Sequence, residues 1–257
     1  MGLFAVTSAS AQDHVLERLN SSPRHHEWTD VDQGERRVRS FVVYPEVPGE
    51  ATAVLVIHEN KGLTDWVRGV ADQLAEAGFV AIAPDLLSGM GPGGGNTGAF
   101  DSADAATQAI YALDQAQVTA DLQAAADHAL SLPACNGTLV VAGFCWGGGQ
   151  ALRFAADRTD LAAAFVFYGS AELTGDETGR IACPVYGFYG GNDARINATI
   201  PGTEAQMAAH GRTFEPVIYP GAGHGFMRAG EGPEASEENR HAMDEAWDRW
   251  LELLREL

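Results

Sequence analysis

Basic residues are scarce in this 257-residue chain, which has 16 lysines and arginines against 35 aspartates and glutamates and a net charge of −19. A surface with this charge repels the phosphate backbone of nucleic acids and anionic lipid head groups. Long apolar runs are also absent, since none approaches the roughly 20 residues that cross a bilayer. We therefore expect neither a nucleic acid nor a membrane among the partners of this protein.

Cysteine is rare as well, with three residues, an odd count and no CxxC pair. Such a set does not indicate a disulfide framework, and it leaves the redox compartment open. Cys135 lies in a Leu-Pro-Ala-Cys-Asn-Gly loop, and Cys183 precedes a proline at the start of an apolar run. We interpret both as structural, whereas the third cysteine, Cys145, lies in a different context.

Residues 1–22 are predicted to be a leader outside the folded domain. A short apolar segment is followed by the small-residue pattern Ala9-Ser-Ala11, which resembles the end of a signal peptide, although a basic n-region is missing. Two interpretations stay open. If residues 1–11 are the end of a signal peptide, the protein is periplasmic or secreted, and if they are a disordered leader, it is cytoplasmic.

Residues 23–257 are predicted to form one α/β domain, because helix and strand patterns alternate without a break in composition that would mark a linker. Continuously apolar runs such as Ala53–Ile57 are typical of buried parallel strands. Amphipathic runs such as Glu237–Leu257 predict helices that pack on the sheet. The pattern indicates a mostly parallel, doubly wound sheet of about eight strands flanked by helices, with the site at the carboxyl ends of the strands.

The segment Gly143-Phe-Cys-Trp-Gly-Gly148 follows an apolar run and precedes a helical pattern, so the chain passes from a strand through a sharp turn into a helix. The spacing G-x-C-x-G is that of the nucleophile elbow of α/β-hydrolases, with cysteine in place of serine. The glycines are required because side chains there would collide with neighbouring backbone. Cys145 is expected at the apex, where the amides and dipole of the following helix favour a thiolate.

Two further residues follow in the order that this fold uses, which is nucleophile, acid, histidine. Asp193 comes after the apolar run Pro184–Tyr189, and His224 lies on a glycine-bracketed loop after the run Thr213–Tyr219. Taken alone, the aspartate is a common turn former and the histidine an ordinary loop residue. Because order and context agree for all three residues, we predict a triad of cysteine, histidine and aspartate.

Two other motifs indicate different chemistry, and both are weaker. His58-Glu59 begins like a zinc-binding helix, but position 62 is glycine and the segment ends a strand. The glycine-rich stretch 88–98 has neither a helix start nor a lysine at the spacing of a phosphate-binding loop. We therefore expect no metal and no cofactor, and we interpret residues 88–98 as a mobile loop near the mouth of the pocket.

Together with Ile57-His-Glu-Asn60 and Gly223-His-Gly-Phe226, these motifs make most of the chain resemble the dienelactone hydrolase family of α/β-hydrolases. The resemblance implies a glutamate near the thiol, which here is Glu59. It also implies an oxyanion hole formed by the backbone amides of Asn60 and Trp146, and the loss of one such donor typically costs ~10²–10³ in turnover.

A carboxylate beside a thiol can take or hold the proton of the thiol, so Glu59 is expected to keep Cys145 partly neutral until substrate displaces Glu59. The alternative is that Glu59 is an ordinary acidic residue at the end of a strand. The namesake enzymes of the family bind the dienelactone carboxylate with two arginines. One of these matches Arg228, for which plain surface charge is the alternative, and the other is replaced by Gly89. Tyr168, at a strand end, is expected either in the pocket wall or in the core.

The triad and the resemblance indicate a hydrolase of small carboxylic esters or lactones that works through an acyl-enzyme. The missing second arginine favours a broader esterase or lactonase over true dienelactone specificity. A different class, a non-catalytic protein that keeps the hydrolase fold to bind a ligand, stays open as the alternative. A nucleotide-dependent oxidoreductase is a third interpretation, and it lacks a dinucleotide fingerprint after the first strand. We expect a monomer or a small homo-oligomer.

Overall fold

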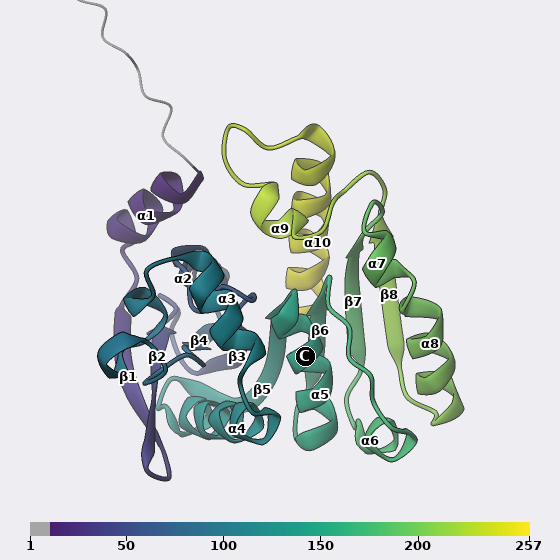
Figure 1. The fold of residues 1–257 in the computed structure, drawn as a ribbon, viewed down its shortest axis with the longest axis horizontal. Coiled ribbons are helices and arrows are strands. Elements are labelled where there is room, and N and C mark those ends of the chain that lie inside the picture. Colours follow the sequence, from purple (N-terminus) through teal and green to yellow (C-terminus); the bar gives the residue numbers. More distant parts are fainter. Residues whose placement is uncertain (1–10) are drawn as a thin grey trace, which may run out of the picture.

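The computed structural model describes residues 11–257, and the side chains of residues 14–257. Its centre is an eight-stranded sheet with the order β1-β2-β4-β3-β5-β6-β7-β8 (Figure 1). The strands are β1 (His26–Gln33), β2 (Arg36–Val43), β3 (Ala51–Ile57), β4 (Val80–Pro84), β5 (Cys135–Phe144), β6 (Ala163–Phe167), β7 (Val185–Gly190) and β8 (Phe214–Tyr219). The prediction of about eight strands is confirmed.

The sheet is antiparallel at one edge and parallel elsewhere. β1 and β2 form a hairpin that turns at Gly34, where φ is 60°, and β2 pairs antiparallel with β4. All pairs from β4 to β8 are parallel. The central strand β3 is apolar except for Thr52, because helices cover both of its faces. This arrangement confirms the predicted mostly parallel, doubly wound sheet.

The helices lie between the strands in sequence and outside them in space, as Figure 1 shows. Over residues 11–257 none of them combines the length and the apolar character needed to cross a membrane. The α-helices are α1 (Ala11–Ser21), α2 (Asp65–Glu76), α3 (Ala103–Tyr111), α4 (Gln115–Ser131), α5 (Trp146–Asp157), α6 (Gly175–Arg180), α7 (Ala194–Asn197), α8 (Ile200–Ala209), α9 (Phe226–Ala229) and α10 (Glu237–Arg255), and two 3₁₀ turns are η1 (Pro92–Gly94) and η2 (Thr97–Ala99).

Two hydrophobic layers hold the helices to the sheet. On one face Trp66 of α2 and Trp250 of α10 pack on Phe144 of β5, with ring centroids 5.1 and 5.9 Å from it. On the other face Leu122 of α4 and Phe154 of α5 belong to a second buried cluster. Burial of this apolar surface is the main source of stability for such a domain, and it fixes the strand ends that carry the polar groups of the site.

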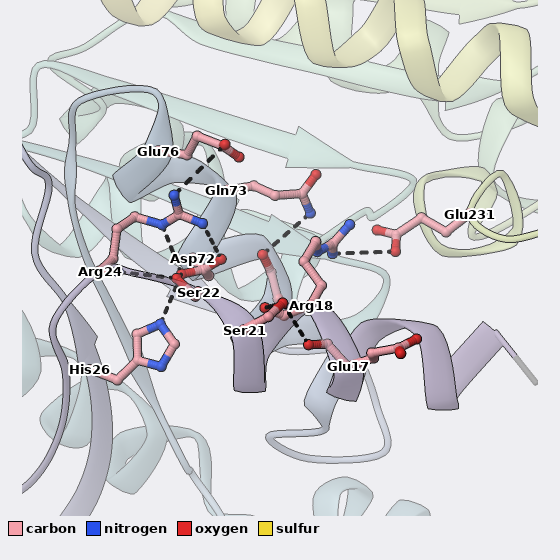
Figure 2. A network of polar contacts seen from close by, with 11 residues as sticks. Glu17, Arg18, Ser21, Ser22, Arg24, His26, Asp72, Gln73, Glu76 and Glu231 are labelled. Carbon is pink, nitrogen blue, oxygen red and sulfur yellow. Dashed lines mark hydrogen bonds and ion pairs between the residues drawn. The ribbon is translucent and has the colours of Figure 1, made fainter.

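Helix α1 differs from the sequence-based expectation, which assigned residues 1–22 to a leader. Val15 of α1 is buried in the core cluster. After the helix ends, Asp72 on α2 accepts hydrogen bonds from Ser22 Oγ (2.6 Å) and from Arg24 Nε and Nη2 (2.9 and 2.6 Å; Figure 2). The apolar face of α1 and this polar network join it to the domain. The part of the leader prediction that covers residues 1–10 lies outside the described residues.

Polar contacts also join this part of the chain to the start of β1 and to the segment after α9. The ring nitrogen Nε2 of His26, at the start of β1, is hydrogen-bonded to Asp72 Oδ1 at 2.8 Å (Figure 2). At the side of α1, Arg18 pairs with Glu231, which follows α9, at 3.4 Å. Removal of the donors of a buried carboxylate is strongly destabilising, so the contacts of Asp72 hold the segment between α1 and β1 against α2.

No residue of the glycine-rich stretch 88–98 lines the cavity next to Cys145, and its place near the mouth of the pocket stays a prediction. Asp85, at the end of β4, accepts hydrogen bonds from the backbone N–H of Thr97 (2.9 Å) and from its hydroxyl (2.7 Å). These bonds tie Thr97 to the end of β4, and its hydroxyl also accepts a hydrogen bond from the backbone N–H of Leu63, in the loop after β3 (3.0 Å). Gly89, earlier in the stretch, lines a surface hollow together with basic residues of β2. Sequence spacing gave no indication of this attachment, which depends on a side chain outside the stretch.

Candidate active site

Four polar residues predicted from the sequence meet at the carboxyl edge of the parallel strands. Glu59 follows β3, Cys145 follows β5, Asp193 follows β7 and His224 follows β8. Because parallel strands end at the same edge of a sheet, residues up to 165 positions apart come together there. The structure therefore brings these four predicted residues into one region.

Cys145 sits at a strained turn. Its φ is 56° and its ψ −115°, an unusual conformation for a residue with a side chain, which the surrounding backbone enforces. A Cβ on Gly143 would lie 1.9 Å from the carbonyl oxygen of Gly147, and a Cβ on Gly147 would lie 2.4 Å from that of His58. The G-x-C-x-G spacing is thus required by the close approach of three backbone segments.

The imidazole of His224 lies between the thiol and a carboxylate. Its Nδ1 is 2.5 Å from Asp193 Oδ2, and its Nε2 is 3.1 Å from Cys145 Sγ. Since an ionised carboxylate only accepts hydrogen bonds, Nδ1 carries the hydrogen, and Nε2 presents its lone pair to the thiol. The S–H group therefore donates to Nε2, which is the geometry of a nucleophile beside a general base.

The thiol is neutral at rest. Burial raises the pKa of Cys145, and the charge of Glu59 raises it further. The backbone N–H of Trp146, the guanidinium of Arg195 and the backbone N–H of Asn60 lower the pKa of the thiol but do not outweigh burial. The helix N-terminus thus acts in the direction expected from the sequence, yet the net shift is toward the protonated thiol.

Two backbone donors converge on the sulfur. The N–H groups of Trp146, at the start of α5, and of Asn60, after β3, both favour a negative charge at Cys145. They come from separate strand ends, so their convergence depends on the pairing of β3 with β5. Donors that meet at the nucleophile are arranged to stabilise an oxyanion formed by attack on a carbonyl group.

Glu59 does not hydrogen-bond the thiol. Its Oε2 instead accepts a hydrogen bond from Arg228 Nε at 2.8 Å, and only 8% of its side chain is exposed, against 44% for that of Arg228. Glu59 thus acts on Cys145 through its charge. Arg228 lies by the same carboxylate, and both residues line a cavity of about 320 Å³ near Lys61 and Glu231, which we call the acidic cavity.

Tyr168 lies beneath the histidine. Its ring meets that of His224 edge-on at 5.2 Å, and the residue is fully buried, with φ of 40°. Its hydroxyl has no hydrogen-bond partner among the described residues. Burial raises the pKa of Tyr168 well above its usual value, so the phenol stays neutral. Tyr168 is therefore both a core residue and the floor of the site.

The sulfur faces a second cavity, of about 310 Å³, which we call the thiol cavity. Cys145, His224, Trp146, Gln150, Arg153 and Arg195 are among the residues that line it. Sequence reasoning missed both arginines. The available signals were weak, because Arg153 comes eight residues after Cys145 on the same face of α5 and Arg195 follows two residues after Asp193.

The described part of the chain, residues 11–257, contains no group of three or more histidine, cysteine, aspartate or glutamate residues placed to hold a metal ion. His58, the residue with the zinc-like sequence context, points into the core and is fully buried. Its Nδ1 is 2.7 Å from the carbonyl oxygen of Glu59, and its Nε2 is 3.3 Å from the backbone nitrogen of Leu86. Both ring nitrogens are thus engaged by backbone.

The chain is similar to several known proteins over nearly its full described length. The family model named "Dienelactone hydrolase family" matches residues 38–257. An Escherichia coli K12 protein named "Putative carboxymethylenebutenolidase" is 31% identical over 227 residues, which cover 81% of this chain and 78% of that protein. A solved structure titled "Putative Dienelactone Hydrolase" from Klebsiella pneumoniae has 26% identity and a TM-score of 0.79, covering 91% of this chain and 99% of the other.

A further solved structure is that of a dienelactone hydrolase-like promiscuous phosphotriesterase from metagenomic libraries, with 26% identity and a TM-score of 0.76 over 91% of this chain and 98% of the other. The family model alone spans well over half of the sequence, including every residue of the candidate site. The chain therefore belongs to the dienelactone hydrolase family, and it is a hydrolase of the carboxylic ester type.

Proposed function

We propose that this protein hydrolyses small carboxylic esters or lactones with Cys145 as the nucleophile, through a thioester acyl-enzyme. The observation that carries the proposal is the contact of 3.1 Å between Cys145 Sγ and His224 Nε2, with Asp193 on the opposite nitrogen of the ring. A thiol, a base and a residue that orients the base are the parts that nucleophilic acyl transfer requires.

Acylation begins with transfer of the Cys145 proton to His224 Nε2. The sulfur then attacks the carbonyl carbon, and the carbonyl oxygen takes up the negative charge beside the N–H groups of Asn60 and Trp146. Collapse of this intermediate breaks the bond to the alcohol oxygen, which receives the proton from Nε2. Asp193 stabilises the imidazolium that exists between these two transfers.

Deacylation repeats the sequence with water. His224 Nε2 accepts a proton from a water molecule, the hydroxide attacks the thioester carbon, and the same two amides face the oxyanion. Collapse expels the sulfur, which recovers its proton from Nε2, and the carboxylic acid leaves. For a lactone the alcohol and the acid are ends of one product molecule.

Glu59 has a restraining role in this proposal. Its charge and the burial of the thiol both raise the pKa of Cys145, so the sulfur rests as a thiol that resists oxidation. A substrate that draws Glu59 away, or neutralises its charge, lowers the pKa of Cys145 and eases loss of the thiol proton. The role of Arg228 as a substrate anchor stays a prediction; its ion pair with Glu59 occupies Nε and leaves the two Nη groups as donors for a second carboxylate.

The test is turnover of p-nitrophenyl acetate and of small lactones by the purified protein, before and after treatment with iodoacetamide. We expect hydrolysis that is abolished by one equivalent of reagent and protected by substrate. Absence of turnover on every ester, lactone and thioester between pH 5 and 9 would contradict the proposal and favour a non-catalytic, ligand-binding role.

A further inference from the structure

The thiol cavity has an unusual charge for this protein. The chain carries a net charge of −19, yet no aspartate or glutamate lines this cavity, whereas two arginines do. The side chains of Arg153 and Arg195 form no ion pair and no hydrogen bond with any residue that the structure describes. Guanidinium groups usually take carboxylate partners where these are available, so two of them left free beside a nucleophile indicate an anionic ligand.

Two acidic residues near these arginines, one in sequence and one through its charge, are already engaged. Asp193, two positions before Arg195, is bound to His224. Glu177 on α6 is close enough for the charge of Arg153 to act on it, but its carboxylate accepts hydrogen bonds from the backbone N–H and the hydroxyl of Thr174, which are the main causes of its lowered pKa. Both arginines therefore keep their donors for a ligand in the cavity.

Both guanidinium groups line the cavity that the reacting sulfur faces. Cys145, Gly149 and Arg153 are spaced four residues apart on α5, so they lie on one face of the helix and all line the cavity. Arg195, at the start of α7, lies near enough for its charge to act on the thiol. An acyl or alcohol group in this cavity thus extends from the sulfur toward one or both cations.

We propose that Arg153 and Arg195 bind an anionic group of the substrate, so that the preferred substrates are esters or lactones that carry a second, negatively charged group. This inference rests on the proposed hydrolase function. It assigns the anion to the thiol cavity, which Arg153 and Arg195 line, and not to the acidic cavity lined by Arg228, whose Nε is held by Glu59.

The experiment compares mono-p-nitrophenyl adipate with p-nitrophenyl hexanoate, which differ in the terminal carboxylate. The quantity measured is the ratio of their kcat/KM values. We expect this ratio to fall about tenfold in Arg153→Gln and in Arg195→Gln, and further in the double variant. The control is Arg255→Gln at the exposed end of α10, which removes the same charge far from the site and should leave the ratio within about twofold.

The outcomes separate the two proposals. If the wild type hydrolyses neither ester, the proposed function itself fails. If it hydrolyses both and the ratio is the same in all variants, the function stands and the arginine assignment is overturned. A ratio that falls only in Arg228→Gln also overturns it, because the anion would then bind in the acidic cavity.

A second inference follows from a different observation, the backbone contacts of His58. A backbone N–H can only donate, so His58 Nε2 accepts from Leu86, and Nδ1 must carry the hydrogen that it donates to the carbonyl of Glu59. Burial lowers the pKa of His58, which keeps this ring neutral. One tautomer is therefore fixed by the fold.

The carbonyl that His58 holds belongs to the peptide unit that carries the oxyanion donor. No peptide bond of the described chain is cis, so the carbonyl of Glu59 and the N–H of Asn60 point in opposite directions. Fixing the carbonyl on His58 directs the N–H toward Cys145, where it favours negative charge. The ring of His58 also stacks on Trp146, the residue of the other donor, with centroids 5.7 Å apart.

We infer that His58 is a positioning residue that orients the Asn60 amide for the oxyanion. A matched pair of variants tests it: His58→Asn places an amide donor near the position of Nδ1, and His58→Gln places an acceptor near that of Nε2. We expect kcat to fall about 10²-fold in His58→Gln with little change in KM, and to recover to within about tenfold of the wild type in His58→Asn.

Equal losses of kcat in the two variants would overturn this role, since packing alone does not distinguish the two amides. A measurement on the intact wild type covers the case in which both variants unfold. The ¹⁵N chemical shifts of the His58 ring should report the neutral Nδ1–H tautomer from pH 5 to 9. An Nε2–H tautomer, or protonation within this range, would contradict the inference.

Discussion

Cys145 at the elbow and Cys183 before β7 are two cysteines of the same domain in different surroundings. Cys183 is buried and free, and burial raises the pKa of its thiol to about 11. Burial also raises the pKa of Cys145, but that sulfur lies 3.1 Å from His224 Nε2 and faces two backbone N–H donors. The comparison teaches that a nearby base and charge-stabilising donors, rather than a low resting pKa, distinguish the candidate nucleophile.

The largest effect is expected when each of the two sulfurs is removed in turn and the activities of the variants are compared. Cys145→Ala should lower kcat for p-nitrophenyl acetate by roughly 10⁴- to 10⁶-fold, because the whole triad acts through this atom. Cys183→Ala should keep kcat within about twofold and lower only Tm, since it removes a buried group far from substrate. Comparable activity in the two variants would remove the distinction between the sulfurs.

The second prediction concerns the orientation of the base. Asp193→Asn keeps the shape of the side chain but can donate to Nδ1, so Nε2 would carry the hydrogen and could not accept one from Cys145. We expect kcat/KM to fall by roughly 10⁴-fold with little change in Tm. A loss below tenfold would mean that the Asp193–His224 contact does not govern the reaction.

The third prediction tests the elbow that places Cys145. Gly147→Ala brings a Cβ to 2.4 Å from the carbonyl oxygen of His58, so the turn and the neighbouring oxyanion amides must shift. We expect kcat to fall by about 10²-fold, together with a lower Tm. Gly202→Ala on α8 is the control, because a Cβ there meets no atom within 4 Å.

The smallest expected effect concerns the charges around the thiol. Glu59 raises the pKa of Cys145 and Arg195 lowers it. Glu59→Gln should therefore lower that pKa, increase the thiolate fraction at pH 7 and speed alkylation by iodoacetamide severalfold, whereas Arg195→Gln should slow it. Shifts in the same direction, or labelling of Cys183 at a similar rate, would contradict this account of the site.

The sequence was sufficient to predict the parts of the molecule that depend on local pattern. The strand, turn and helix around Cys145 follow from apolar runs and glycine spacing, and the order of Asp193 and His224 follows from the topology. The helix predicted over Glu237–Leu257 is α10, Glu237–Arg255. These features depend only on residues that are neighbours in sequence and on the order nucleophile, acid, histidine along the chain.

The features that the sequence did not reveal join distant segments. Glu59 and Arg228 are 169 positions apart, so their ion pair depends on how the loops after β3 and β8 meet. Likewise, Arg153 and Arg195 share a cavity only because α5 and α7 converge at the sheet edge. Helix α1 was missed because its contacts, Val15 in the core cluster and Arg18 with Glu231, join it to residues far along the chain.

The most direct test of the nucleophile is identification of the atom that carries the acyl group. The wild type is mixed with p-nitrophenyl acetate, quenched in acid during turnover, digested and analysed by mass spectrometry. We predict one acetyl group, sensitive to hydroxylamine, on the peptide that contains Cys145, and none on Cys135 or Cys183. An acetyl group on another residue, or the same adduct yield in Cys145→Ala, would contradict the mechanism.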